Sequence, residues 1–187
     1  MADNDAVIVD FGRTAFTPAR KGALAGVRPD DMLAQVVKTL IERNNIDPND
    51  VDDLKVGTAF PEGPQGMNIA KLVAQQVGLP DSVTGATTNR FCGSSMETAH
   101  QAFANIRAEM GDVYIVAGVE SMTQVPMGGA TYSPNPDQVA NRPLDHTDMG
   151  VTAENLARIY DIPRETQDDF ALRSQMNATT ALHQGLF

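Results

Sequence analysis

The chain has 187 residues, of which 42% are hydrophobic and 20% are charged, as in ordinary globular proteins with a core of their own. Its formal net charge of −10 disfavours binding to DNA or RNA, because such binding requires cationic side chains that neutralise phosphates. No apolar run approaches the roughly 20 residues that span a membrane. Three dispersed histidines and one cysteine give no metal-binding pattern, and the lone cysteine with an acidic start predicts a cytoplasmic location.

The first two thirds of the chain alternate predicted strands with predicted helices. Strands are expected where apolar and β-branched residues are grouped between turn residues, at 6–11, 54–59, 84–91 and 112–119. Helices are expected between them, at 29–44, at 69–77 and from just after Cys92 to Gly111. On the third helix, one apolar face is predicted for Met96, Ala99, Phe103, Ile106 and Met110. Four alternations of this kind predict a layered α/β sheet with right-handed crossovers.

The pattern changes after Ser121. Residues 124–148 are rich in proline and include Gly128-Gly129, and a connection of this length inside a compact protein is usually functional. Two helices are expected beyond it, at 152–160 and at 163–184, with no further strand.

Cys92 stands at the predicted end of a strand and the start of a helix. A helix N-terminus presents unpaired backbone N–H groups and the positive end of the helix dipole, and both stabilise a thiolate. This placement favours a reactive thiol. The alternative is that Cys92 is a small buried hydrophobic residue.

The residues around Cys92 also carry a family resemblance. Asn-Arg-Phe-Cys-Gly-Ser-Ser at 89–95 resembles the nucleophile motif of the thiolases, the acetyl-CoA acyltransferases. Further matches follow the family order, at 65–71, 116–122, 149–155 and 167–171. They cover almost the whole chain, so the resemblance is specific.

The resemblance implies a fold and a domain organisation. It implies a thiolase-like half at 1–122, with a mixed, mostly parallel sheet, helices on both faces and its last strand absent. Residues 123–187 would form part of a mainly helical inserted loop domain. The second half of a thiolase carries a Gly-His-Pro motif and a second cysteine, whereas here no histidine precedes a proline and Cys92 is the only cysteine.

The resemblance further implies the chemistry of acyl transfer. Cys92 would be the nucleophile that receives the acyl group of a 3-ketoacyl-CoA and passes it to free CoA, or runs the reverse condensation with acetyl-CoA. CoA would be a substrate, with no bound cofactor and no metal. Met149 would line the acyl pocket. The strand at 84–91 would pair across the axis of a dimer, and the full-length protein would be a dimer or a tetramer.

Three alternatives to parts of this interpretation remain open. The chain could be an inactive truncated paralogue that acts as a binding or dimerisation module, or a condensing enzyme related to the ketoacyl synthases. Met149 could simply pack a helix start, and His100 is expected at the surface.

Because the histidine and the second cysteine of the family are missing, we expect the chain alone to have little or no thiolase turnover. The C-terminal half is then a required partner.

Overall fold

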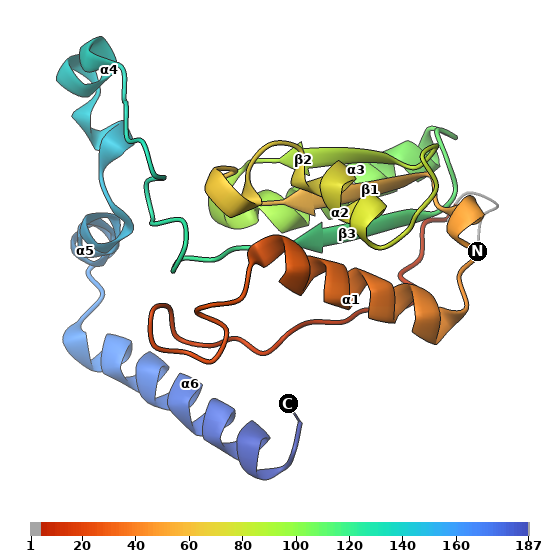
Figure 1. The fold of residues 1–187 in the computed structure, drawn as a ribbon. Coiled ribbons are helices and arrows are strands. Elements are labelled where there is room, and N and C mark those ends of the chain that lie inside the picture. Colours follow the sequence, from red (N-terminus) through yellow and green to blue (C-terminus); the bar gives the residue numbers. More distant parts are fainter. Residues whose placement is uncertain (1–4, 187) are drawn as a thin grey trace. The chain divides into compact units, whose positions relative to one another are not determined.

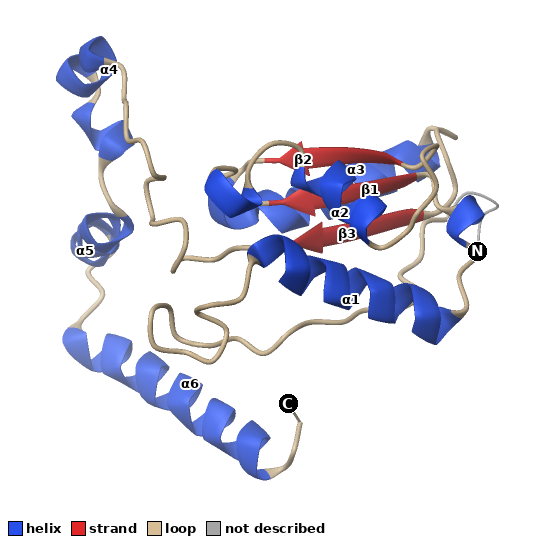
Figure 2. Ribbon diagram, viewed as in Figure 1, coloured by secondary structure: helices blue, strands red, loops and turns tan. Residues whose placement is uncertain are grey.

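The computed structural model describes residues 5–186 and divides into two compact units, the first ending at Tyr132 and the second beginning at Ser133. The first unit contains the sheet, whereas the second consists of helices and loops (Figure 2). The division into domains 1–122 and 123–187, which rests on the resemblance, stays a prediction.

The first unit is an α/β fold built on a parallel sheet. Its strands are β1 (Asp53–Gly57), β2 (Thr84–Thr88) and β3 (Tyr114–Gly118), in the spatial order β2-β1-β3 (Figure 1). Both pairs are parallel, and Leu54 of the central strand lies opposite Gly85 and Ile115. Parallel neighbours need crossover connections, which the intervening helices provide. The layered α/β prediction is therefore confirmed, with a sheet that is parallel throughout.

Helices cover both faces of this sheet. α1 (Pro29–Asn44) and α2 (Ile69–Gln76) pack on the face that carries Leu54 and Val56, and α3 (Ser94–Arg107) packs on the opposite face (Figure 1). Short 3₁₀ turns occupy Pro48–Asp50, Gly63–Gln65 and Phe91–Gly93. The apolar core lies between the sheet, α1 and α2, and consists of Leu33, Ala34, Val37, Val51, Leu54, Val56, Ile69, Ala70, Val73, Ala74, Leu79, Val83, Ile115 and Val119.

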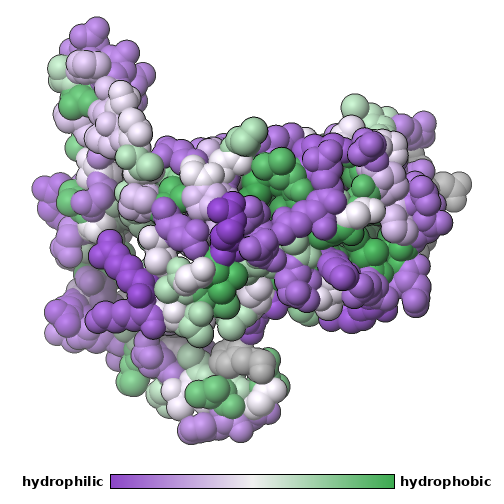
Figure 3. Space-filling view, viewed as in Figure 1, coloured by the Kyte–Doolittle hydropathy of each residue, from purple (hydrophilic) through white to green (hydrophobic). Residues whose placement is uncertain are grey.

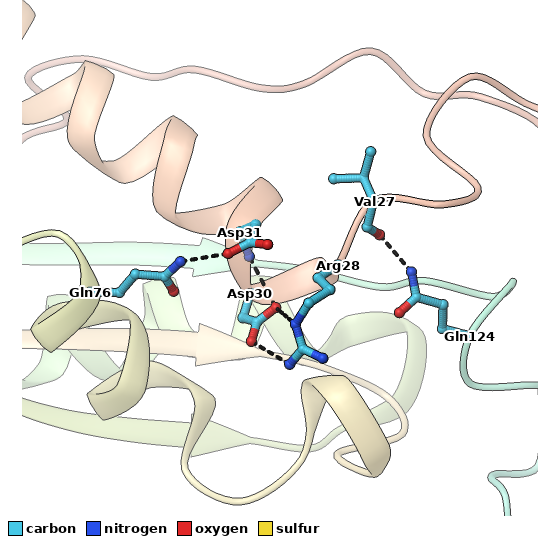
Figure 4. Close-up of polar contacts among 6 residues, drawn as sticks. All are labelled: Val27, Arg28, Asp30, Asp31, Gln76 and Gln124. Carbon is cyan, nitrogen blue, oxygen red and sulfur yellow. Dashed lines mark hydrogen bonds and ion pairs between the residues drawn. The ribbon is translucent and has the colours of Figure 1, made fainter.

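The bounds predicted for α1 are confirmed at both ends. Pro29 occupies the first helical position, and the helix ends where Asn45 adopts a left-handed conformation with φ of 50°. Asp30 and Asp31 stand in the first turn, where the helix dipole favours carboxylates. Asp30 accepts two hydrogen bonds from Arg28, and Asp31 accepts one from Gln76 of α2 (Figure 4).

The apolar face predicted for α3 is wrong. Met96, Phe103 and Met110 are exposed, and the buried side chains of the helix are Ser94, Thr98 and Ala102. The face that packs on the sheet therefore consists of small side chains. At the start of α3, β1 and β3 approach the helix through Gly57 and Gly118, and this close approach leaves no room for large residues there.

The strand predicted at 6–11 is also wrong. These residues form no strand in the structure, and Ile8 is 90% exposed. Instead, Asp10 accepts hydrogen bonds from Asn44 and Arg43 at the end of α1, and these bonds keep the pKa of Asp10 below its usual value. A β-branched run becomes a strand only where a neighbouring strand completes its backbone hydrogen bonds, and this segment lies against α1 instead.

The second unit contains α4 (Pro136–Asn141), a 3₁₀ turn (Pro143–His146), α5 (Met149–Ile159) and α6 (Arg164–His183). α5 and α6 confirm the two predicted helices, although α5 begins earlier because Asp148 caps it by accepting from the Gly150 and Val151 N–H groups. Within the described range, none of these helices has a buried residue.

Apolar side chains reach the surface in several places, which Figure 3 shows as green areas among hydrophilic ones. Between residues 5 and 186, no helix combines the length and the apolarity that a bilayer crossing requires.

Candidate active site around Cys92

Cys92 is exposed and lies in the 3₁₀ turn Phe91–Gly93, which leads directly into α3. The strand β2 ends at Thr88, so the turn occupies the short connection between the carboxyl end of β2 and the first residue of α3. This arrangement confirms the predicted place of Cys92 between a strand and a helix. Because the thiol is exposed rather than packed in the core, the structure disagrees with the interpretation of Cys92 as a buried hydrophobic residue.

The backbone of this turn is held in a conformation that few residues adopt. Phe91 has a φ of 44°, in the left-handed region, where a side chain with a Cβ is disfavoured. The buried hydroxyl of Ser94 accepts a hydrogen bond from the Arg90 N–H at 2.9 Å and donates one to the Phe91 carbonyl at 2.5 Å. The Phe91 N–H also donates to the side chain of Asn89 at 2.9 Å. These hydrogen bonds fix the backbone at Phe91 and thereby the position of the next residue, Cys92.

Glycines on the two neighbouring strands allow the start of α3 to approach the sheet closely. A Cβ on Gly57 of β1 would lie 2.3 Å from the backbone of Ser94 and Ser95, and one on Gly118 of β3 would lie 2.6 Å from the Ser95 Cβ. Gly57 and Gly118 are opposite each other in the sheet. The carboxyl ends of two strands thus support the helix turn that follows Cys92.

Charged side chains surround the first turns of α3. Glu97 forms an ion pair with Arg90 at 2.6 Å, and the Nδ1 atom of His100 lies 4.0 Å from the same carboxylate. The side chain of His100 is 69% exposed, in agreement with the surface position predicted for it. Glu97 is therefore the charged neighbour of His100 at the start of α3.

A polar network around the buried Gln65 lies at the same end of the sheet, and sequence reasoning missed it. Gln65 is fully buried and bonded to Glu120, which also accepts from the Ala59 N–H at 2.7 Å. Both residues lie in motifs that carry the family resemblance. Their pairing leaves no signal in the sequence, since 55 positions separate them.

Met149 is the first residue of α5 and is 62% exposed. It belongs to the second compact unit, whereas Cys92 belongs to the first. The role of Met149 in an acyl pocket therefore stays a prediction, and so does the nucleophilic role of Cys92. Among the described residues, no group of three or more His, Cys, Asp or Glu side chains could hold a metal ion.

Comparison with known proteins assigns the chain a clear set of relatives. Residues 6–187 match the family described as thiolase, N-terminal domain. A 3-ketoacyl-CoA thiolase of Bacillus subtilis is 42% identical over 183 residues, which are 98% of this chain and 47% of that protein. Proteins of the same name from Saccharophagus degradans and Psychrobacter cryohalolentis are 41% and 40% identical, over 98% and 100% of this chain. The chain thus spans about half the length of the curated relatives it matches.

Proposed function

This chain belongs to the thiolase family, and we propose that it provides the acyl-accepting half of a 3-ketoacyl-CoA thiolase. The observation that supports the proposal most strongly is the exposed position of Cys92 at the start of a helix. The only thiol of the chain is exposed at the start of α3, on a turn whose conformation Ser94 maintains. The relatives bear the name of this activity, and the match covers the segment that contains Cys92.

In the proposed reaction the Cys92 thiolate attacks the 3-keto carbon of the substrate. The bond between carbons 2 and 3 breaks, its electron pair stays on carbon 2, and protonation there releases acetyl-CoA. The acyl group remains on Sγ as a thioester. The thiolate of free CoA then attacks this thioester, so acyl-CoA leaves and the Cys92 thiolate is regenerated. The Cys92 N–H would donate to the oxyanion that forms at the attacked carbonyl.

Two proton-transfer roles of this reaction have no residue in the chain. The family's Gly-His-Pro histidine and its second cysteine are absent from the 187-residue sequence. We therefore propose that the second half is a required partner, and that CoA, 3-ketoacyl-CoA and acetyl-CoA are substrates rather than bound cofactors.

We also propose that the active protein is a homo-oligomer that pairs through β2. This strand lies at one edge of the described sheet, so its outer side is open to a second strand. Since β3 forms the other edge, the choice of β2 rests on the resemblance. A role in β-oxidation and a cytoplasmic location likewise stay predictions.

The test of the proposal is covalent acylation of Cys92. The chain is incubated with acetyl-CoA, alone and together with the C-terminal part of the Bacillus subtilis relative that the match does not cover, and its mass is measured. We expect the mass to increase by one acetyl group in the presence of the complementary half, and a Cys92→Ser variant to lack this thioester. An unchanged mass with that half bound would contradict the proposal.

Turnover is measured in the same samples with a 3-ketoacyl-CoA and free CoA. We expect the chain alone to show little or no thiolysis. A rate like that of the intact relative, without any second half, would refute the proposed requirement for a partner.

A further inference from the structure

Gln65 is a fully buried polar side chain near the carboxyl ends of the strands. It lies in the 3₁₀ turn Gly63–Gln65. Both the NH₂ group and the oxygen of its side-chain amide form hydrogen bonds. Its Nε2 donates to the Phe60 carbonyl at 2.8 Å and to a carboxylate oxygen of Glu120, while its Oε1 accepts from the Ser121 N–H at 3.0 Å. Burying a side-chain amide is unfavourable in free energy unless hydrogen-bond partners are present. The partners at this site match the donor and the acceptor of a glutamine side chain.

The Glu120 side chain extends this network to the residues that follow β1. One carboxylate oxygen accepts from the Ala59 N–H at 2.7 Å, and the other accepts from the Thr58 hydroxyl at 3.3 Å. The Thr58 N–H in turn donates to the Thr88 carbonyl at the end of β2. Gln65 and Glu120 together therefore position residues 58–60 against the end of the neighbouring strand.

Phe60 connects this segment to the turn that carries Cys92. Its ring contacts the ring of Phe91, with centroids 6.0 Å apart and planes inclined by 51°. Phe91 directly precedes Cys92 and has the left-handed φ of 44°. A residue with a side chain persists in that region only where its surroundings hold it there. The contacts that hold Phe91 there are the Phe60 ring and the hydrogen bonds that the Phe91 backbone forms with the side chains of Asn89 and Ser94.

We propose that Gln65 is a positioning residue for Cys92, which it reaches through Phe60 and Phe91 without contacting the thiol. Its amide fixes the Phe60 carbonyl, the Phe60 ring then restricts Phe91, and Phe91 determines the place of Cys92 at the start of α3. The catalytic meaning of this inference rests on the proposed function. The positioning itself is independent of acyl transfer and is measured without any substrate.

Gln124 provides a matched control. Its Nε2 donates to the Val27 carbonyl at 2.7 Å, a bond of the same type between two segments that contain neither Phe60 nor Phe91 (Figure 4). Both glutamines thus donate to a backbone carbonyl, and both connect segments that are distant in the chain, Gln65 by its bonds with Glu120 and Ser121 and Gln124 by its bond to Val27. If Gln65 only stabilised the fold, replacing either glutamine would have the same kind of effect on Cys92.

The experiment uses the full 187-residue chain, whose one cysteine accepts a trifluoromethyl label at a single site. Fluorine NMR spectra of labelled Cys92 are compared for the parent chain, Gln65→Ala, Gln124→Ala and Phe60→Leu. We expect the Gln65→Ala and Phe60→Leu spectra to show shifted or additional signals and the Gln124→Ala spectrum to match the parent. Alkylation of the unlabelled thiol by iodoacetamide should slow by roughly two- to tenfold in these two variants, the factor associated with one lost hydrogen bond in Gln65→Ala and with one lost aromatic contact in Phe60→Leu.

Several results would overturn the inference. One is a Gln65→Ala spectrum and alkylation rate equal to those of the parent, and another is an equal change in Gln124→Ala. Should Gln65→Ala fail to fold, as judged by thermal melting, Phe60→Leu decides, because it keeps Gln65 and removes only the ring contact. An unchanged Phe60→Leu spectrum then refutes the route through the rings. Failure of Cys92 to become acylated would contradict the proposed function and leave these spectra unaffected.

Discussion

Gly57 at the end of β1 lies directly against Ser94 at the start of α3, so closely that a Cβ on the glycine would lie 2.3 Å from the Ser94 backbone carbon. Real Cβ atoms do not approach backbone atoms to this distance. The contact joins the central strand to the helix turn that follows Cys92. The position of the candidate nucleophile therefore depends on the absence of one side chain on a neighbouring strand.

Replacing that glycine should displace the helix start. We expect Gly57→Ala to lower the free energy of unfolding by at least about 1–3 kcal/mol, because the added methyl group overlaps backbone that cannot move freely. Urea denaturation measures this change. Gly26→Ala is the matched control, since a Cβ there meets no atom within 4 Å, and its effect should stay within about 1 kcal/mol. Equal stabilities of the two variants would contradict the close contact.

Ser94 maintains the Cys92 turn through its two hydrogen bonds, to the Arg90 N–H and the Phe91 carbonyl. Ser94→Ala removes both side-chain hydrogen bonds, although the Phe91 carbonyl still accepts from the Ser94 N–H, so at about 0.5–1.5 kcal/mol for each bond we expect a loss of about 1–3 kcal/mol in unfolding free energy. The neighbouring Ser95 is exposed, and Ser95→Ala should change stability by about 0.5 kcal/mol or less. Chemical denaturation of both variants provides the comparison, and the prediction is wrong if Ser94→Ala is as stable as its control.

A buried ion pair lies on the α3 side of β1. Lys55 and Asp53 are 2.7 Å apart with side chains that are 8% and 13% exposed, and Asp53 Oδ1 has no hydrogen-bond partner in the described structure. Removing one charge leaves the other buried and unpaired, so Lys55→Met should cost about 3–5 kcal/mol. The double variant Asp53→Leu/Lys55→Met should recover most of this loss, because both desolvated charges are then gone.

Equilibrium unfolding of the single and double variants tests this prediction. The exposed pair of Lys38 and Glu42, with a separation of 3.8 Å, serves as the control. Lys38→Met should change stability by about 0.5 kcal/mol or less, because water screens this pair. A Lys55→Met variant as mildly affected as Lys38→Met would show that the Asp53 pair is not effectively buried.

The pair of Arg28 and Asp30 should make a pH-dependent contribution at the start of α1. Partial burial raises the pKa of Asp30, but hydrogen bonds from Arg28 and the Asp31 N–H outweigh it, so the net pKa lies below the usual value. A carboxyl whose folded pKa is lowered stabilises the protein above its unfolded pKa, near 4, and this contribution disappears as the pH falls through the folded value.

A double-mutant cycle with Arg28→Gln and Asp30→Asn measures this contribution. We expect a coupling of about 0.2–1 kcal/mol at pH 7, since the pair is partly exposed. The coupling should decrease in acid and vanish once Asp30 is protonated in both states. A coupling that is the same at pH 7 and in acid would contradict an origin in the Asp30 charge.

Local sequence signals predicted several elements accurately because the decisive interactions are local. Pro29 and Asn45 delimit α1 through their own backbone preferences, and the glycine at 78 follows the end of α2 in a left-handed conformation. The strand-to-helix placement of Cys92 was predicted for the same reason. Each of these features depends on residues that are close together in the chain.

Features that depend on distant neighbours were missed. The run at 6–11 has the composition of a strand, but Asp10 bonds to Arg43 and Asn44 of α1, more than 30 positions away. The apolar residues of α3 predicted a buried face, yet Gly57 and Gly118 require small side chains at the contact. Neither outcome could be read from the segment itself.

The sequence by itself therefore determined the α/β alternation, the bounds of α1 and the placement of Cys92 between β2 and α3, because backbone preference and apolar periodicity act over a few residues. Only the tertiary structure decided which face of α3 is buried and which residues surround the Cys92 turn. Gln65 and Glu120 are 55 positions apart and become neighbours only when β1 and β3 pair in register. Hydrogen bonds and ring contacts require proximity in space, which composition and spacing do not encode.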